Sequence, residues 1–123
     1  MADQSVAPVE RPSGAKLIER ERWRQEAPEP EGEDWTAEYD DANHESGDLA
    51  RAAACYALRS VVGERAMENN GHLDAWWPWD REYWKPTDRK RMLVKAGALI
   101  AAEIDRLDRV AARTPVQEVD RGA

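Results

Sequence analysis

Residues 87–113 read TDRKRMLVKAGALIAAEIDRLDRVAAR, and this stretch decides the fold class. Thr87 is a suitable N-cap, and Asp88 belongs to the first turn of a helix. We expect that helix to reach about Arg113, because Pro115 prevents its continuation. Apolar or small residues recur along it at spacings of four and three: Leu93, Gly97, Ile100, Ile104, Leu107 and Ala111. Such a heptad seam is typical of a helix that packs lengthwise against another helix.

A glycine stands in the middle of this seam. Gly97 lies between Ala96 and Ala98, and a glycine inside an exposed helix costs about 1 kcal/mol relative to alanine. A close helix crossing accounts for it, because a larger residue would keep the two backbones apart. We therefore expect another helix to cross the long helix at Gly97.

Two further helices are expected upstream. The first runs from Ser13 or Gly14 to Glu26, because Ser13 can cap it and Pro28 ends it. The second runs from Gly47 to about residue 61. Ser46 is its predicted N-cap, Asp48 lies in its first turn, and its inner stripe is Leu49, Ala53, Tyr56 and Ser60.

The remaining segments complete an all-α fold. A short helix is expected around residues 64–69, and residues 72–86 are predicted to form a tryptophan-rich loop. No period-two alternation predicts a strand. The prediction is a small helical domain over residues 14–113, which includes an acidic loop at 27–45 and ends in the long helix. Residues 1–13 are expected to form a disordered leader and residues 114–123 a flexible tail.

The composition gives this domain a poor core. The hydrophobic fraction is 41%, but 20 residues are alanine, Leu, Ile and Val total 18, and phenylalanine is absent. A shallow core combined with a regular seam favours self-association, most simply a homodimer through the last helix. The alternative is that the seam packs within the chain, against the helix at 47–61.

Charge is segregated along the chain. Residues 26–48 contain ten carboxylates and no Lys or Arg, so a net charge of −7 divides into a −10 segment and a +3 remainder. Six bases gather within residues 81–95. Duplex nucleic acid is an improbable partner, because the acidic segment repels phosphate.

Cysteine content and hydropathy restrict the cellular compartments in which this protein is expected. Cys55 is the only cysteine, which excludes an internal disulfide and a multi-cysteine zinc site, and we expect it to be a small buried residue. No apolar stretch approaches the length that spans a bilayer. These features predict a soluble protein of a reducing compartment, without a membrane partner.

Three blocks of the sequence resemble a known group of proteins. They are YDDANHESGDLARAAACYAL at 39–58, WPWDREYWKP at 77–86 and RKRMLVKAGALIAAEIDRLDR at 89–109. In this order they resemble an uncharacterised family of small proteins that bacteriophages and prophages of proteobacteria encode, over about residues 18–109. The resemblance implies a phage-type accessory protein in the cytoplasm of a bacterial host, with a role in nucleotide metabolism or in countering host defence.

The strongest candidate site combines aromatic rings with cations. Stacking faces beside bases suit a nucleotide or another small anion. The predicted ligand-binding residues are Trp77, Trp79, Trp84, Lys85, Arg89, Arg91, Lys95, Arg22, Gln25 and His44. The alternative is structural, because tryptophan can replace the missing Leu and Phe, and we expect at least two of the tryptophans at 76, 77, 79 and 84 to lie in the core.

Three of these side chains have open alternatives. Lys95 lies in an apolar run and is expected to be partly buried, either in a structural ion pair or on a phosphate. Arg22 and Gln25 continue the face that Ile18 begins. They are either partly buried ligand contacts or solvated, and the sequence favours solvated.

A second candidate site is acidic. Asp40, Asp41 and Asp48, with His44 nearby, could bind a divalent ion at a helix start. The competing interpretation is an acid-rich capping loop. His72, the other histidine, has no partner at helical spacing.

These sites favour a binding protein that needs no cofactor and no catalytic machinery. Its sharpest form sequesters a nucleotide or a nucleotide-derived signal of host defence. One alternative is a MazG-like, magnesium-dependent nucleoside triphosphate pyrophosphohydrolase, since Glu38 and Asp41, like Glu45 and Asp48, have ExxD spacing. That family carries ExxE pairs on a preceding helix, which this sequence lacks. Another alternative is an acidic protein-interaction module that targets a host protein.

Overall fold

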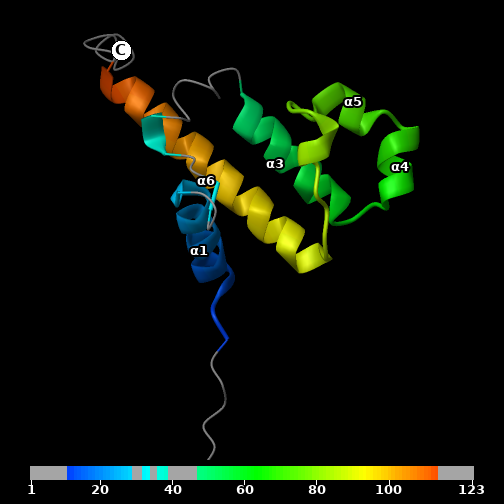
Figure 1. The fold of residues 1–123 in the computed structure, drawn as a ribbon, viewed down its shortest axis with the longest axis horizontal. Helices are drawn as coiled ribbons and strands as arrows, with labels where there is room; N and C mark the ends of the chain where they lie inside the picture. Colours follow the sequence, from blue (N-terminus) through cyan, green and yellow to red (C-terminus); the bar gives the residue numbers. More distant parts are fainter. Residues whose placement is uncertain (1–10, 29–31, 34–35, 39–46, 114–123) are drawn as a thin grey trace, which may run out of the picture.

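The computed structural model describes residues 11–28, 32–33, 36–38 and 47–113. Its α-helices are α1 (Gly14–Glu26), α3 (Asp48–Arg59), α4 (Glu64–Asn69), α5 (His72–Trp76) and α6 (Arg89–Arg113), with a 3-10 turn η1 (Arg81–Tyr83) before α6. The described residues contain no strand. The all-α fold with a long C-terminal helix is confirmed (Figure 1).

Two helix starts differ from the prediction by one residue. The Asp88 carboxylate accepts a 2.8 Å hydrogen bond from the Arg91 backbone N–H, so Asp88, and not Thr87, caps α6. The N-cap of α3 is Gly47, in a left-handed conformation (φ 83°), and not Ser46. α1 starts as predicted, with the Ser13 hydroxyl accepting from the Lys16 N–H at 3.1 Å.

The predicted tryptophan-rich loop is partly helical. Gly71 adopts a left-handed conformation (φ 72°) that ends the turn after α4 and starts α5. The expected break at residues 70–71 is therefore confirmed, but the segment that follows it contains both α5 and η1. The tryptophan-rich segment over 72–86 thus includes two short helical turns that the sequence did not predict.

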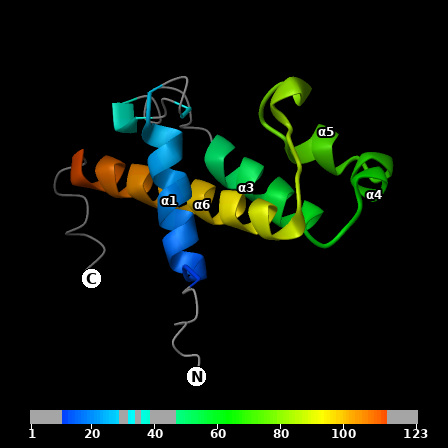
Figure 2. The ribbon, with the colours of Figure 1, turned by 60° about the horizontal axis from the view of Figure 1, so that its bottom comes forward.

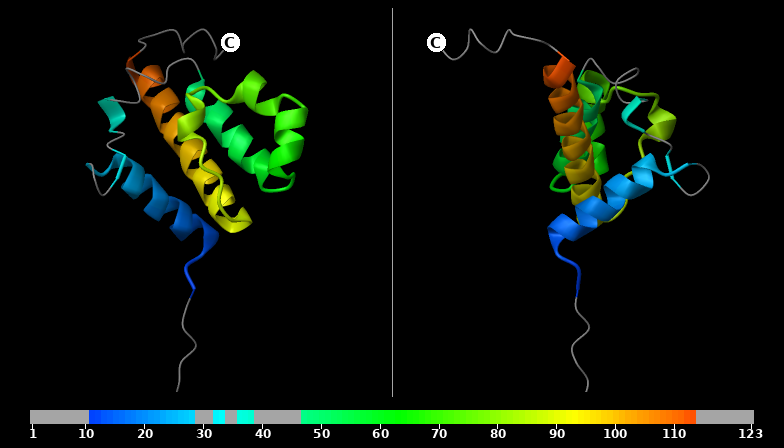
Figure 3. Two further views of the ribbon diagram at one scale, coloured as in Figure 1. Left: turned by 45° about the vertical axis from the view of Figure 1, so that its right-hand side comes forward. Right: turned by 90° about the vertical axis from the view of Figure 1, so that its left-hand side faces the viewer.

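The core lies between α3 and α6, which run antiparallel (Figures 1 and 3). Small residues on both helices allow close approach. The buried cluster comprises Leu49, Ala52, Ala53, Cys55 and Tyr56 of α3, Met92, Ala96, Leu99 and Ala102 of α6, and Met67, Leu73 and Trp77 between them. Cys55 is buried, as expected.

The helix α1 crosses α6 on another side (Figure 2). A Cβ atom built on Gly97 would lie 2.8 Å from Ile18 Cγ1 and closer still to Ile18 Cδ1. Both distances are below ordinary van der Waals contact. The close helix crossing expected at Gly97 is thus confirmed, and its partner is α1.

The heptad seam of α6 does not face α3. Its large side chains are about half exposed: Leu93 47%, Ile100 48%, Ile104 53% and Leu107 50%. The α3 contact uses a different stripe, from Met92 to Ala102. The interpretation of the seam as an intramolecular contact with the second helix is therefore wrong. Among the described helices, none is long and apolar enough to cross a membrane.

Candidate functional site

A buried carboxylate organises the contact between α1 and the first half of α6. The Glu21 side chain is 2% exposed. It accepts hydrogen bonds from Arg24 Nε at 3.0 Å and Nη2 at 2.8 Å, both on α1. A third comes from Arg91 Nη2 of α6 at 2.6 Å. We call Glu21, Arg24 and Arg91 the ion-pair cluster.

The ion-pair cluster keeps its charges. Burial works to raise the Glu21 pKa, but hydrogen bonds from Arg24 and Arg91 outweigh burial and hold that pKa below its ordinary value. The bond to Glu21 raises the pKa of Arg24 in turn. Two guanidinium groups therefore share one buried carboxylate, and Arg24 has a second carboxylate partner, Glu33, at 3.0 Å.

Lys95 lies one turn beyond Arg91 on α6 and is half-buried, as predicted. Its Nζ donates to the Lys85 carbonyl oxygen at 3.1 Å and lies 5.2 Å from the centroid of the Tyr56 ring. Burial, followed by repulsion from Arg91, lowers its pKa. Within the described residues no carboxylate lies within ion-pair distance of Lys95, so the structural ion pair is not formed there.

The aromatic residues beneath Lys95 pack on one another. Tyr56 stacks on Trp84 with ring centroids 4.9 Å apart, and Trp77 meets the edges of both rings. Trp79 packs on Trp77 at 5.3 Å. We call Tyr56, Trp77, Trp79 and Trp84 the aromatic cluster.

Hydrogen bonds fix the indoles of the aromatic cluster. Trp77 is 7% exposed and donates to the Asp80 carbonyl at 3.1 Å, while Trp84 donates to the Glu64 carboxylate at 2.9 Å. Trp77 is in the core, and Trp79 and Trp84 pack against it, which confirms the expected core role of at least two tryptophans. Their faces are largely used internally, which leaves little ring surface for a stacked ligand.

Arg22 and Gln25 are buried rather than solvated. The Arg22 side chain is 11% exposed and pairs with Glu26 at 2.8 Å and with Asp105 at 3.5 Å. Gln25 is 3% exposed and accepts a 3.5 Å bond from Arg22. The preference for solvated side chains is wrong, because the α1 crossing covers this face.

Other predicted residues fall at different places. Lys85 and Arg89 are exposed. Lys85 precedes α6 and meets Lys95 through its carbonyl oxygen. Trp76, one of the four tryptophans that the sequence offers for stacking or for the core, is 55% exposed, and Tyr83 is 56% exposed. The sequence interpretation also missed Glu21 as the organising anion, although it is the one acid among the arginines at 20, 22 and 24.

The predicted metal site lies mostly outside the described residues. This applies to Asp40, Asp41 and His44, whereas Asp48 lies in the first turn of α3 as expected. In the part of the chain that is described, no group of three or more His, Cys, Asp or Glu side chains is placed to hold a metal ion.

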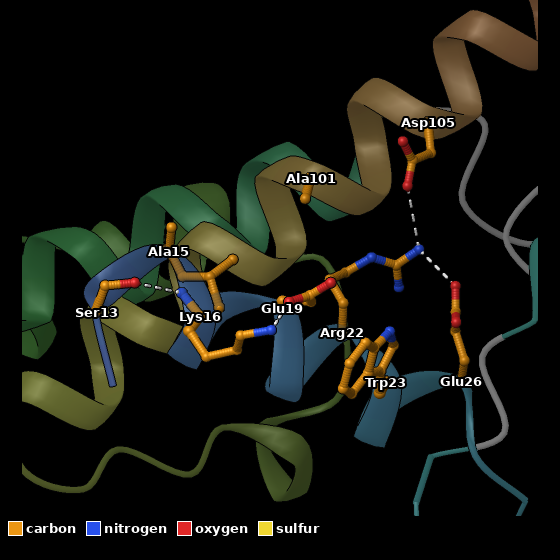
Figure 4. Close-up of a pocket in the computed structure, with 10 residues that line it drawn as sticks. Ser13, Ala15, Lys16, Glu19, Arg22, Trp23, Glu26, Ala101 and Asp105 are labelled. Carbon is orange, nitrogen blue, oxygen red and sulfur yellow. Dashed lines mark hydrogen bonds and ion pairs between the residues drawn. The ribbon is translucent and has the colours of Figure 1, made fainter. Parts of the chain in front are cut away.

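A separate cleft lies on the outer flank of α1, where it crosses α6 (Figure 4). Trp23, which is 57% exposed, lines it together with Lys16 and Arg22. Its cations already have anionic partners: Lys16 pairs with Glu19 at 2.7 Å, and Arg22 pairs with Glu26 and Asp105. This cleft therefore offers less to an anion than Lys95 does.

Comparison with known proteins adds no relative. The chain matches no family model, no curated protein and no solved structure.

Proposed function

We propose that this protein binds a small anionic ligand at Lys95 and Arg91, beside the aromatic cluster. The observation that carries the proposal is the half-buried Lys95 ammonium, which has a carbonyl and a ring face as partners but no carboxylate among the described residues. A phosphate or carboxylate placed there would stabilise the ammonium by charge and hydrogen bonding, and so offset the desolvation that lowers the Lys95 pKa.

Arg91 supports the same site. Its Nη2 atom bonds to Glu21, but a guanidinium has five N–H donors, so others remain for a ligand. Lys85, whose carbonyl oxygen accepts from Lys95, adds an exposed positive charge. Phosphate-bearing compounds, nucleotides first, fit this combination of a compact ammonium and a planar donor.

The biological setting belongs to the same proposal. A phage-type protein in the bacterial cytoplasm that sequesters a nucleotide-derived signal needs such a site and no reaction. The proposed protein is a homo-oligomer, and the exposed seam of α6 supports this part. The hydrolase and acidic-module alternatives depend on residues 26–48, most of which lie outside the described part, and both stay predictions.

Calorimetric titration tests the site. Wild type and two variants are titrated at low salt with inorganic pyrophosphate, ATP and a cyclic dinucleotide. Lys95→Met removes the ammonium and keeps the stem, and we expect affinity to fall about tenfold or more, the effect of losing one charge-assisted hydrogen bond. Lys90→Met, an exposed lysine on the same helix, is the matched control and is expected to stay within about twofold.

The contrary results are equally clear. The proposal is wrong if wild type binds none of these anions at millimolar concentration, or if both variants weaken binding equally. Release of pyrophosphate from ATP when magnesium is added would favour the hydrolase instead.

A further inference from the structure

Except at Gly97, where α1 crosses, the seam of α6 is an apolar strip whose large side chains are not covered by the described helices. Leu93, Ile100, Ile104 and Leu107 are each about half exposed, and Val110 is 39% exposed at the end of the strip. α3 and α1 contact α6 from other sides (Figure 2). From Leu93 to Leu107 the strip extends about 21 Å along the helix. Its spacing of four and three is the one that a second helix fits.

Unpaired charges lie at the two ends of the strip. Arg89 and Lys90 are exposed at its start and Asp108 is exposed near its end, and within the described residues none of them has an ion-pair partner. Lys90 and Asp108 lie on the same flank of the strip and are separated by about 27 Å along the axis. An antiparallel copy of α6 places the bases of one chain beside the acid of the other, at both ends. A parallel copy places like charges together.

We propose that two copies of this chain associate through the α6 strip, antiparallel about a two-fold axis. Leu93 of each copy then lies opposite Ile104 of the other. Lys90 lies near Asp108 of the other, because these two residues are five helical turns apart and share one flank of the strip. A two-fold interface is self-complementary, which is what a strip with opposite charges at its two ends provides. The surface is distinct from the Lys95 site, so this inference stands independently of the proposed anion binding.

The exposed area sets the strength of the dimer. The five side chains expose on the order of 400 Å² per chain, within the range of a functional surface patch but below the roughly 800 Å² per partner of a standard-size interface. The dimer is therefore expected to dissociate on dilution, with a dissociation constant in about the micromolar range.

Sedimentation velocity of the full chain, from about 1 to 500 µM, tests this inference. We expect a concentration-dependent monomer–dimer equilibrium. Ile104→Asp should weaken the dimer by about a hundredfold or more, because it places two carboxylates in an apolar seam. Val61→Asp alters an apolar residue that is 66% exposed outside the strip, and should leave the dimer unchanged. Circular dichroism of both variants confirms that the helices persist.

Charge reversal tests the orientation. Lys90→Asp and Asp108→Lys should each weaken the dimer about five- to tenfold at low salt, and the double variant should recover it. A wild-type chain that stays monomeric at 500 µM overturns the proposal. So does a dimer that Ile104→Asp leaves intact. A double variant no better than the singles overturns the antiparallel orientation.

Discussion

Glu21 is a single buried acid that joins arginines of two helices, Arg24 of α1 and Arg91 of α6. Arginines at positions 20, 22 and 24 flank it in the sequence. Its side chain points from α1 toward Arg91 of α6. Its carboxylate accepts three charge-assisted hydrogen bonds. Lys95, one turn away from Arg91, receives none of that negative charge directly. The contrast between the two cations makes Lys95 the more available one.

Glu21→Gln is expected to destabilise the fold by about 2 kcal/mol. Breaking a fully buried ion pair costs roughly 3–5 kcal/mol, but the side chains of Arg24 and Arg91 are 37% and 36% exposed, so solvent recovers part of the loss. Urea denaturation measures the difference. Glu19→Gln, in an exposed pair with Lys16, is the control, and we expect a change below about 0.5 kcal/mol.

The same carboxylate gives stability a defined pH dependence. Because the folded-state pKa of Glu21 lies below its ordinary value of 4.5, its contribution is fully present above that value. It is lost as the pH falls from 4.5 through the folded-state pKa. We expect the unfolding free energy of wild type to fall more steeply than that of Glu21→Gln below pH 4.5. Parallel acid limbs in the two proteins would contradict this assignment.

At the scale of the element, α6 divides its surface among several tasks. One stripe, which includes Met92 and Leu99, fills the core against α3, and the face at Gly97 receives α1. Arg91 and Lys95 lie on a polar face, and the heptad strip is exposed. Each of these stripes extends over several turns, which the 25 residues of α6 provide.

The start of α6 depends on Asp88. Asp88→Ala removes the acceptor of the Arg91 N–H and is expected to cost about 1 kcal/mol, the usual effect of losing an N-cap. Thr87→Ala should change stability by less than about 0.5 kcal/mol, because an exposed residue outside the helix satisfies no end group. Thermal unfolding of the two variants measures which of the two residues caps α6. Equal losses of stability in the two variants would show that Thr87 contributes to the cap as much as Asp88 does.

The crossing of α1 over α6 depends on the absence of a side chain at position 97. Gly97→Val should destabilise the fold by about 1–3 kcal/mol, because its methyl groups would overlap Ile18. Gly14→Val meets no atom within 4 Å of its Cβ and is the control, with a small expected change. The double variant Gly97→Val with Ile18→Ala should recover part of the loss, and denaturant titration of a double-mutant cycle measures that coupling. Strictly additive losses would show that the two residues do not meet.

At the scale of the whole molecule, the helices are unequally anchored. α3 and α6 share the core, and α4 and α5 extend it, whereas α1 packs chiefly on α6 through a partly polar contact. We expect native-state hydrogen exchange to show α1 amides exchanging through a partial opening, at a lower free energy than the central amides of α3 and α6. Uniform protection in all three helices would instead indicate a single cooperative unit.

Local patterns predict the helices of this chain well. The α1 bounds, the α4 bounds and the C-terminal end of α6 follow from capping residues and prolines, whose effects act within a turn. The glycine at 97 predicts a crossing for a similar reason, since helix propensity makes its position expensive. The caps at Asp88 and Gly47 differ from the prediction because neighbouring residues compete for the same end groups.

By itself, the sequence determined that the chain is helical, where the helices lie, and which residues could bind an anion or form a seam. Only the tertiary structure decided which face of α6 meets α3, that Arg22 and Gln25 are buried, and that the tryptophans pack on one another. It also paired Glu21 with Arg91, which lie 70 residues apart. Helix periodicity fixes which residues share a face, but side-chain volume and charge across the contacts decide which faces meet.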